Sequence, residues 1–201
     1  MKLSQVAAIT SSVSKYMKDD IPAGLKTIRD IGYQAVQLSC IGDFDPTEVG
    51  QACKDLGLTV CATHEPVANI FGDIDKVIEK HRILETHYVG YPYPHIEPES
   101  MDDVLKIAED LNKAGKTFSE AGLKMVYHNH DLEFQRFDGR VALEVIYENT
   151  DPEYLLGEPD TYWIQNGGAC VVDWMEKLKG RMPVLHMKDY GMVGKNENAI
   201  F

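Results

Sequence analysis

Short apolar runs alternate with longer amphipathic segments along almost the whole chain. An apolar run that stops at polar or turn residues is typical of a buried strand, whereas apolar positions three and four residues apart are typical of a helix. On this basis strands are expected at residues 6–10, 35–40, 58–64, 87–91, 155–160 and 183–188, and in the stretch that begins at Lys124. Helices are expected at residues 21–31, 45–56, 73–84, 100–121, 141–148 and 171–178, and residues 191–201 carry only a weak pattern.

Start and stop residues support these helices. Asp45-Pro46 and Ser100 are good helix starts, since a short polar side chain can accept a hydrogen bond from the first turn. Gly32, Gly57 and Gly122 follow the last apolar position of three helices, where a left-handed residue ends a helix. Each of these glycines leads directly into an expected strand.

Strand–helix units in series, with short loops between them, predict a parallel sheet covered by helices. Seven such units without a linker favour a (β/α)8 TIM barrel as one domain over residues 1–201. A complete barrel needs eight strands and ~250 residues. The eighth βα unit is therefore expected to be missing from this 201-residue chain, which would leave the barrel incomplete at its C-terminus.

Composition narrows the class of protein. The apolar fraction of 44% and the charged fraction of 26% are those of an ordinary globular protein. A formal net charge of −12 argues against sequence-independent binding to nucleic acid. The four cysteines form no CxxC pair, and neither a signal peptide nor an apolar stretch of membrane-spanning length is evident. We therefore expect a cytoplasmic protein that binds neither nucleic acid nor membrane.

Polar side chains follow the expected strands in phase. They are His64 and Glu65; Tyr91, Tyr93 and His95; His128, His130 and Glu133; Glu158 and Asp160; and His186, Lys188 and Asp189. In a parallel barrel the carboxyl ends of all strands lie on one rim, so these groups would converge on one pocket. Imidazole and carboxylate together suit a divalent cation that accepts mixed nitrogen and oxygen ligands. A sugar hydroxyl or carbonyl at such a cation would have its neighbouring C–H polarised.

Several of these residues also have plain structural interpretations. His128 and His130 alternate along a strand, so one of them can point into the barrel and the other away from it. Trp163 and Trp174 are interpreted as packing residues more readily than as substrate platforms, because tryptophan buries a large apolar area.

Three motifs, HNHDLEF, EPDTYWIQNGG and GRMPVLHMKD, resemble the sugar phosphate isomerase/epimerase family. That family consists of xylose isomerase-like TIM barrels and is related to inosose dehydratases and AP endonuclease 2-type barrels. The resemblance covers almost the whole chain. It implies a metal held by Glu133, Asp160 and His186, whereas the family's fourth ligand, a Glu on strand eight, has no counterpart here.

The resemblance also implies roles around the metal. Lys188 and His64 are expected to act in acid–base chemistry or substrate binding, and Glu133 either as the base or as a metal ligand. Substrate-binding positions are expected at His128, His130, Tyr91 and Trp163. His128 is an alternative to Glu133 as the first metal ligand.

The leading hypothesis is a divalent-metal-dependent isomerase or epimerase, or a dehydratase, acting on a sugar, sugar phosphate or cyclitol. Its reaction would begin by proton abstraction next to a metal-bound carbonyl, and the metal would be Mn, Co, Zn, Fe or Mg. The alternative is a non-catalytic sugar-binding or partner-dependent subunit that keeps the barrel pocket without the full metal site. An endonuclease shares the fold, but the acidic charge disfavours it. The sequence leaves open whether the protein is a homo-oligomer.

Overall fold

A computed structural model describes residues 2, 5–17, 20–194 and 197–200 of the chain. Three residues on which the expectation of no signal peptide partly rests, Met1, Leu3 and Ser4, lie outside the described residues. The chain divides into two compact units, Met1–Gly90 and Tyr91–Phe201, which are described one at a time. The expectation of a single domain over residues 1–201 stays a prediction.

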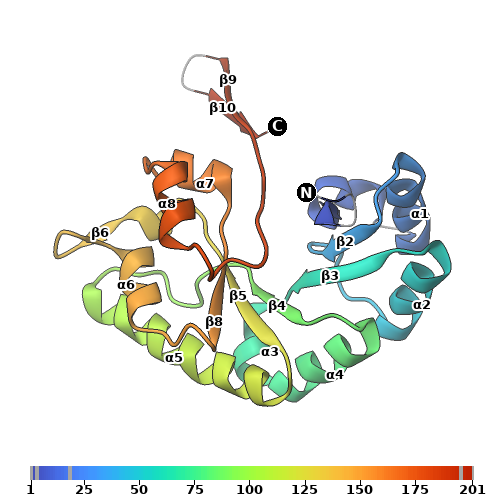
Figure 1. Ribbon diagram of the computed structural model, residues 1–201, viewed down its shortest axis with the longest axis horizontal. Coiled ribbons are helices and arrows are strands. Elements are labelled where there is room, and N and C mark those ends of the chain that lie inside the picture. Colours follow the sequence, from blue (N-terminus) through green and yellow to red (C-terminus); the bar gives the residue numbers. More distant parts are fainter. Residues whose placement is uncertain (1, 3–4, 18–19, 195–196, 201) are drawn as a thin grey trace. The chain divides into compact units, whose positions relative to one another are not determined.

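The first unit is a parallel sheet with helices between its strands (Figure 1). Its strands pair in chain order, each parallel to the next. They are β1 (Ala7–Ile9), β2 (Ala35–Leu38), β3 (Thr59–His64) and β4 (Tyr88–Tyr91). The helices are η2 (Thr10–Tyr16), α1 (Ile21–Ile31), α2 (Pro46–Leu56), α3 (Val67–Gly72) and α4 (Ile74–Leu84).

Local sequence signals account for the helices of this unit. Asp20 accepts a hydrogen bond from the Ala23 N–H at the start of α1, and Gly32, with φ +116°, ends it. Leu25 and Ile28 project from α1 into a core that also contains Val36 of β2. Burial of these apolar side chains is the main force that holds the helix against the sheet.

The second unit contains the remaining elements. Helix α5 (Met101–Glu120) leads into the strand β5 (Lys124–His128), and α6 (Ala142–Glu148) lies between β5 and the parallel strand β8 (Leu155–Glu158). The two helices α5 and α6 pack against each other. The other elements are η3 (Leu132–Phe134), β6 (Arg136–Phe137), β7 (Arg140–Val141), α7 (Thr161–Asn166), α8 (Val171–Lys177), β9 (Tyr190–Gly194) and β10 (Glu197–Ile200). In Figure 1 the chain after β8 passes through α7 and α8 before it reaches the β9–β10 hairpin.

The register of β5 against β8 places His128 opposite Glu158 at the carboxyl ends of the two strands. Ser100 starts α5 by accepting a hydrogen bond from the Asp103 N–H, as its position in the sequence predicts. Along α5, one face carries fully buried apolar residues, including Leu111 and Phe118. This face covers the strands that hold the polar residues described below.

One strand prediction is wrong. Residues 183–188 form no strand and make only an isolated bridge, between Asp160 and His186. The His186 N–H donates to the Pro159 carbonyl at 3.0 Å, and the Thr161 N–H donates to the His186 carbonyl at 3.1 Å. Pro159 and Pro183 have no N–H to donate, so a continuous ladder cannot form on either side of this bridge.

The other strand and helix predictions are confirmed to within a few residues. The weakly patterned tail forms the antiparallel β9–β10 hairpin over its described residues. No described helix combines the length and the apolar character that crossing a lipid bilayer demands. The expected fold class is confirmed as parallel strands that alternate with helices.

Candidate functional site

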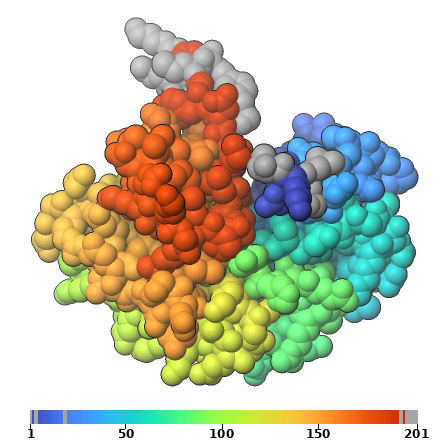
Figure 2. All heavy atoms as spheres, viewed as in Figure 1, coloured from blue at the N-terminus to red at the C-terminus, as the bar shows by residue number. Residues whose placement is uncertain are grey.

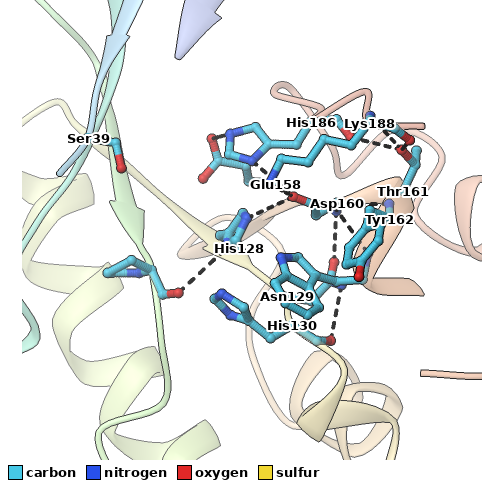
Figure 3. Close-up of polar contacts among 12 residues, drawn as sticks. Ser39, His128, Asn129, His130, Glu158, Asp160, Thr161, Tyr162, His186 and Lys188 are labelled. Atoms are coloured by element: carbon cyan, nitrogen blue, oxygen red, sulfur yellow. Dashed lines mark hydrogen bonds and ion pairs between the residues drawn. The ribbon is translucent and has the colours of Figure 1, made fainter. Parts of the chain in front are cut away.

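Asp160 is the centre of a polar cluster at the end of β8 (Figure 3). Its Oδ2 lies 2.6 Å from Lys188 Nζ, 3.2 Å from His128 Nε2 and 3.4 Å from His186 Nδ1. The residue itself has no exposed surface. A buried carboxylate is stable only with such partners, because removal of a charge from water without compensation is costly.

Local backbone structure fixes the Asp160 side chain. Its Oδ1 caps α7 by accepting from the N–H groups of Tyr162 and Trp163, at 3.1 and 3.3 Å. The Asp160 N–H donates in turn to the Asn129 side chain at 3.0 Å. One oxygen of the carboxylate therefore holds the helix, while the other faces the cationic groups.

Glu158, grouped with Asp160 among the strand-end residues but assigned neither a catalytic nor a metal-binding role from the sequence, belongs to the same cluster. Its Oε1 lies 3.2 Å from His186 Nε2, so His186 stands between two carboxylates. Glu158 and Asp160 are two residues apart on one extended segment, which places their side chains on the same face. That spacing was the available signal for including Glu158 with Asp160.

The charges of the cluster shift one another. Burial alone would raise the pKa of Asp160, but the contacts with His128, His186 and Lys188 outweigh it and hold that pKa well below its usual range. Burial alone would lower the pKa of His186, but Asp160 and Glu158 raise it to about 9. His186 is therefore an imidazolium at neutral pH when the cluster holds no metal ion.

Glu133, the expected first metal ligand, lies elsewhere. It is 1% exposed, and it accepts hydrogen bonds from the Tyr127 hydroxyl at 3.1 Å and from the His130 N–H at 2.8 Å. Burial raises its pKa to about 7. Among the described residues, Asp160 and His186 therefore lie together with His128. Glu133 instead binds the backbone N–H of His130, just after the end of β5.

His130 and Trp163 lie beside the cluster, with ring centroids 4.9 Å apart. The His130 ring also lies 4.8 Å from that of His128. Burial, and next the neighbouring His128, lower the pKa of His130 to about 4, so its imidazole is neutral at neutral pH. Alternation along a strand had left open that one of His128 and His130 points away from the site. In the structure both side chains lie at the cluster around Asp160.

Tyr91 and His64, two further expected site residues, each make a side-chain hydrogen bond within their own unit. Tyr91 has no exposed surface, and its hydroxyl accepts from the His95 N–H at 2.8 Å. His64 ends β3 in the first unit, where its Nδ1 lies 3.0 Å from Ser39 Oγ. The roles expected for these two residues stay predictions.

The donor set at Asp160 fits a divalent metal of the borderline class. Two imidazole nitrogens, from His128 and His186, lie within 3.4 Å of one carboxylate oxygen. Mixed imidazole and carboxylate donors suit Zn²⁺, Fe²⁺ and Co²⁺ better than Mg²⁺ or Ca²⁺, which prefer oxygen ligands only. Lys188 occupies the same carboxylate oxygen, so a metal and the Lys188 ammonium would compete for it.

Comparison with known proteins gives a short match to a curated relative and longer matches to solved structures. No family model matches the chain. An inosose dehydratase of Mesomycoplasma hyopneumoniae (strain 7448) is 32% identical over 83 residues, which are 41% of this chain and 27% of that protein. The match thus spans about a quarter of the length of the curated relative.

Solved structures give much longer matches. A sugar phosphate isomerase/epimerase from Parabacteroides distasonis superposes with a TM-score of 0.80 at 25% identity, covering 98% of this chain and 79% of that one. An L-ribulose 3-epimerase superposes with a TM-score of 0.71 at 17% identity, covering 96% and 73%. The structural neighbours are therefore sugar phosphate isomerase/epimerases and xylose isomerase-like TIM barrels, as the three motifs predicted.

Proposed function

We propose that this chain is an isomerase, an epimerase or a dehydratase that acts on a sugar or cyclitol with the help of a divalent metal. The observation that carries the proposal is the convergence of His128, His186 and Lys188 on one oxygen of the buried Asp160. The names of the structural neighbours and of the curated relative support the same reaction class.

The residues that would hold the metal are His128, Asp160 and His186. When bound, such a metal supplies Lewis-acid polarisation of a carbonyl or hydroxyl oxygen. To hold the metal, His186 would have to be a neutral imidazole, because an imidazole nitrogen binds a metal only when it is deprotonated. Glu158, 3.2 Å from His186 Nε2, would then orient that ring.

The proton step can be assigned to residues beside this group. His130 is neutral at neutral pH, so its imidazole is able to accept a proton from the carbon next to a substrate carbonyl. The electron pair of that C–H bond would move onto the carbonyl oxygen, and the Lys188 ammonium would stabilise the developing negative charge. Return of the proton to the former carbonyl carbon, with transfer of the neighbouring hydroxyl proton to the former carbonyl oxygen, would give isomerisation. Return of the proton to the opposite face of the original carbon would give epimerisation.

Exchange of carbon-bound hydrogen with solvent tests the proposal before the true substrate is known. Simple ketoses and a keto-inositol are incubated in D₂O with the protein and Zn²⁺, Co²⁺ or Mn²⁺, and the loss of proton signals next to the carbonyl is followed by NMR. We expect exchange with at least one compound, and its loss in His130→Gln and in Asp160→Asn.

Val172→Ala is the control, because Val172 is an exposed residue on α8 outside the polar cluster. No exchange with any compound and metal, or unchanged exchange in both site variants, would contradict the proposal. Sugar-induced thermal stabilisation without exchange would instead favour the alternative, a non-catalytic sugar-binding protein.

A further inference from the structure

A row of aromatic rings leads away from the polar cluster at Asp160. The ring centroids of His186 and His128 lie 4.7 Å apart, and those of His130 and Trp163 lie 4.9 Å apart. Tyr93 continues the row, with its ring 5.2 Å from that of His130. We call Tyr93, His130 and Trp163 the ring wall. Its outer end is open, because Tyr93 is 47% exposed.

The segments that carry the ring wall are tied together. The Asn166 side chain at the end of α7 donates to Asp131 just after β5, at 2.7 Å. The hydroxyl of the buried Tyr91 accepts from the His95 N–H, which holds the loop that contains Tyr93. In Figure 2 the orange and red atoms of the chain after β8, to which α7 belongs, form a continuous part of the surface. A preformed aromatic surface loses little entropy when a ligand binds.

The ring wall contains no lysine or arginine that would bind a phosphate. Asp131, an acidic residue, directly follows His130 in the chain. Lys188 lies at the reacting end of the site, 2.6 Å from Asp160, and is not part of the ring wall. The guanidinium of Arg181 donates to the carbonyls of Leu155, Tyr147 and Thr150, and so is committed to the backbone. Phosphate recognition generally uses Arg or Lys, or a helix N-terminus.

We infer that the substrate is an uncharged glycoside whose reacting sugar lies at Asp160 and Lys188 and whose second ring stacks on the ring wall. The apolar C–H face of a pyranose, or an aryl group, is complementary to exposed tyrosine and tryptophan rings. A phosphorylated sugar would instead place its negative charges beside the acidic side chain of Asp131 and a wall that offers no lysine or arginine. This inference rests on the proposed function, since it assigns the reacting sugar to the same cluster.

Binding of three compounds tests the inference: phenyl β-D-glucopyranoside, methyl β-D-glucopyranoside and glucose 6-phosphate. Affinities are measured by calorimetry on the whole chain with Zn²⁺ present. Trp163 and Trp174 are the chain's two tryptophans. Trp174→Phe therefore leaves Trp163 as the fluorescent reporter at the wall. We expect the phenyl glycoside to bind about tenfold more tightly than the methyl glycoside, and to change the Trp163 emission.

Variants of Tyr93 locate the second ring. Because its side chain is half exposed, Tyr93→Ala should leave the fold intact, which far-ultraviolet circular dichroism checks. We expect Tyr93→Ala to remove most of the preference for the phenyl glycoside and Tyr93→Phe to retain it, whereas affinity for the methyl glycoside stays unchanged. Val172→Ala, another exposed apolar truncation, should retain the preference.

The inference is overturned if glucose 6-phosphate binds more tightly than both glycosides, or if Tyr93→Ala leaves the ratio of phenyl to methyl affinity unchanged. Absence of binding by all three compounds overturns it as well. Its fate is separable from that of the proposed function. If Tyr93→Ala reduces glycoside binding but no hydrogen exchange occurs, only the proposed reaction is contradicted. If a ketose exchanges hydrogen but Tyr93→Ala does not change the ratio of phenyl to methyl glycoside affinity, only the glycoside inference is contradicted.

Discussion

The Lys188 ammonium lies 2.6 Å from an oxygen of the fully buried Asp160. The same oxygen faces the imidazoles of His128 and His186. In that position the charge of Asp160 helps to raise the pKa of His186. Contacts with Asp160 also bring together three motifs that are far apart in the sequence, at residues 128–134, 158–168 and 180–189.

Replacing Asp160 by Asn should lower the pKa of His186 from about 9 towards its ordinary value. The reason is that Asn lacks the charge that stabilises the imidazolium, although it can still cap α7. Glu158 remains, so part of the elevation should persist. The measurement is an NMR titration of the His186 ring protons in the metal-free protein.

Lys188→Met is the matched control for this titration. It removes a cation from Asp160 but leaves the carboxylate that faces His186, so the pKa of His186 should stay high. An unchanged His186 titration in Asp160→Asn would show that Glu158 alone sets this pKa.

Zn²⁺ or Co²⁺ should raise the melting temperature of the protein more than Mg²⁺ at the same concentration, and EDTA should reverse the effect. A ligand that binds only the folded state at 100 times its dissociation constant stabilises it by about 2.7 kcal/mol. His128→Ala should abolish the shift, because it removes one of the two imidazoles at Asp160. His130→Ala is the control and should keep it; the reverse pattern would place the metal elsewhere.

Most of the fold follows from sequence pattern because each element carries its own signals. The glycines at 32, 57 and 122 all adopt positive φ at helix ends, as expected. One hairpin was missed although its signal was present. Asp138-Gly139 joins β6 to β7 with φ of +49° and +79°, the conformation that this dipeptide favours in tight turns.

The site was predicted less completely, for a physical reason. Position at a strand end indicates which side chains gather at one edge, and His128, His186 and Lys188 do contact Asp160. It cannot show which way a loop side chain turns after the strand has ended. Glu133 lies in η3, where its carboxylate turns back to the Tyr127 hydroxyl and the His130 N–H. Its role as ligand or base, taken from the resemblance, stays a prediction.

Glu133 should make stability fall as pH rises. Its pKa is raised by burial to about 7, so the folded state holds this proton more tightly than the unfolded state does. The folded state therefore loses stability between the ordinary carboxyl pKa of 4.5 and pH 7, by about 3 kcal/mol in total. Urea unfolding at pH 5 and pH 8 measures this loss.

Glu133→Gln is the informative variant for that experiment. It keeps the size of the side chain and one acceptor, but it removes the charge, so the decline in stability from pH 5 to pH 8 should become smaller by about the same 3 kcal/mol. Asp102→Asn, at an exposed position in the first turn of α5, is the control and should leave the decline unchanged. An equal decline in wild type and Glu133→Gln would mean that another group causes it.

Gly115→Ala should destabilise the second unit even though Ala favours a helix by about 1 kcal/mol over Gly. Gly115 lies in the middle of α5, and a Cβ there would come within 2.4 Å of the Tyr154 carbonyl oxygen. Backbone cannot yield as a side chain does, so the overpacking should cost about 1–3 kcal/mol and exceed the gain in helix propensity. Because β8 begins at Leu155, directly after Tyr154, the shift should also weaken metal binding at Asp160.

Gly72→Ala, at a helical position with open space around it, is the control and should be neutral or stabilising in denaturant unfolding. Equal stability of Gly115→Ala and wild type would show that α5 can move away from β8 without cost.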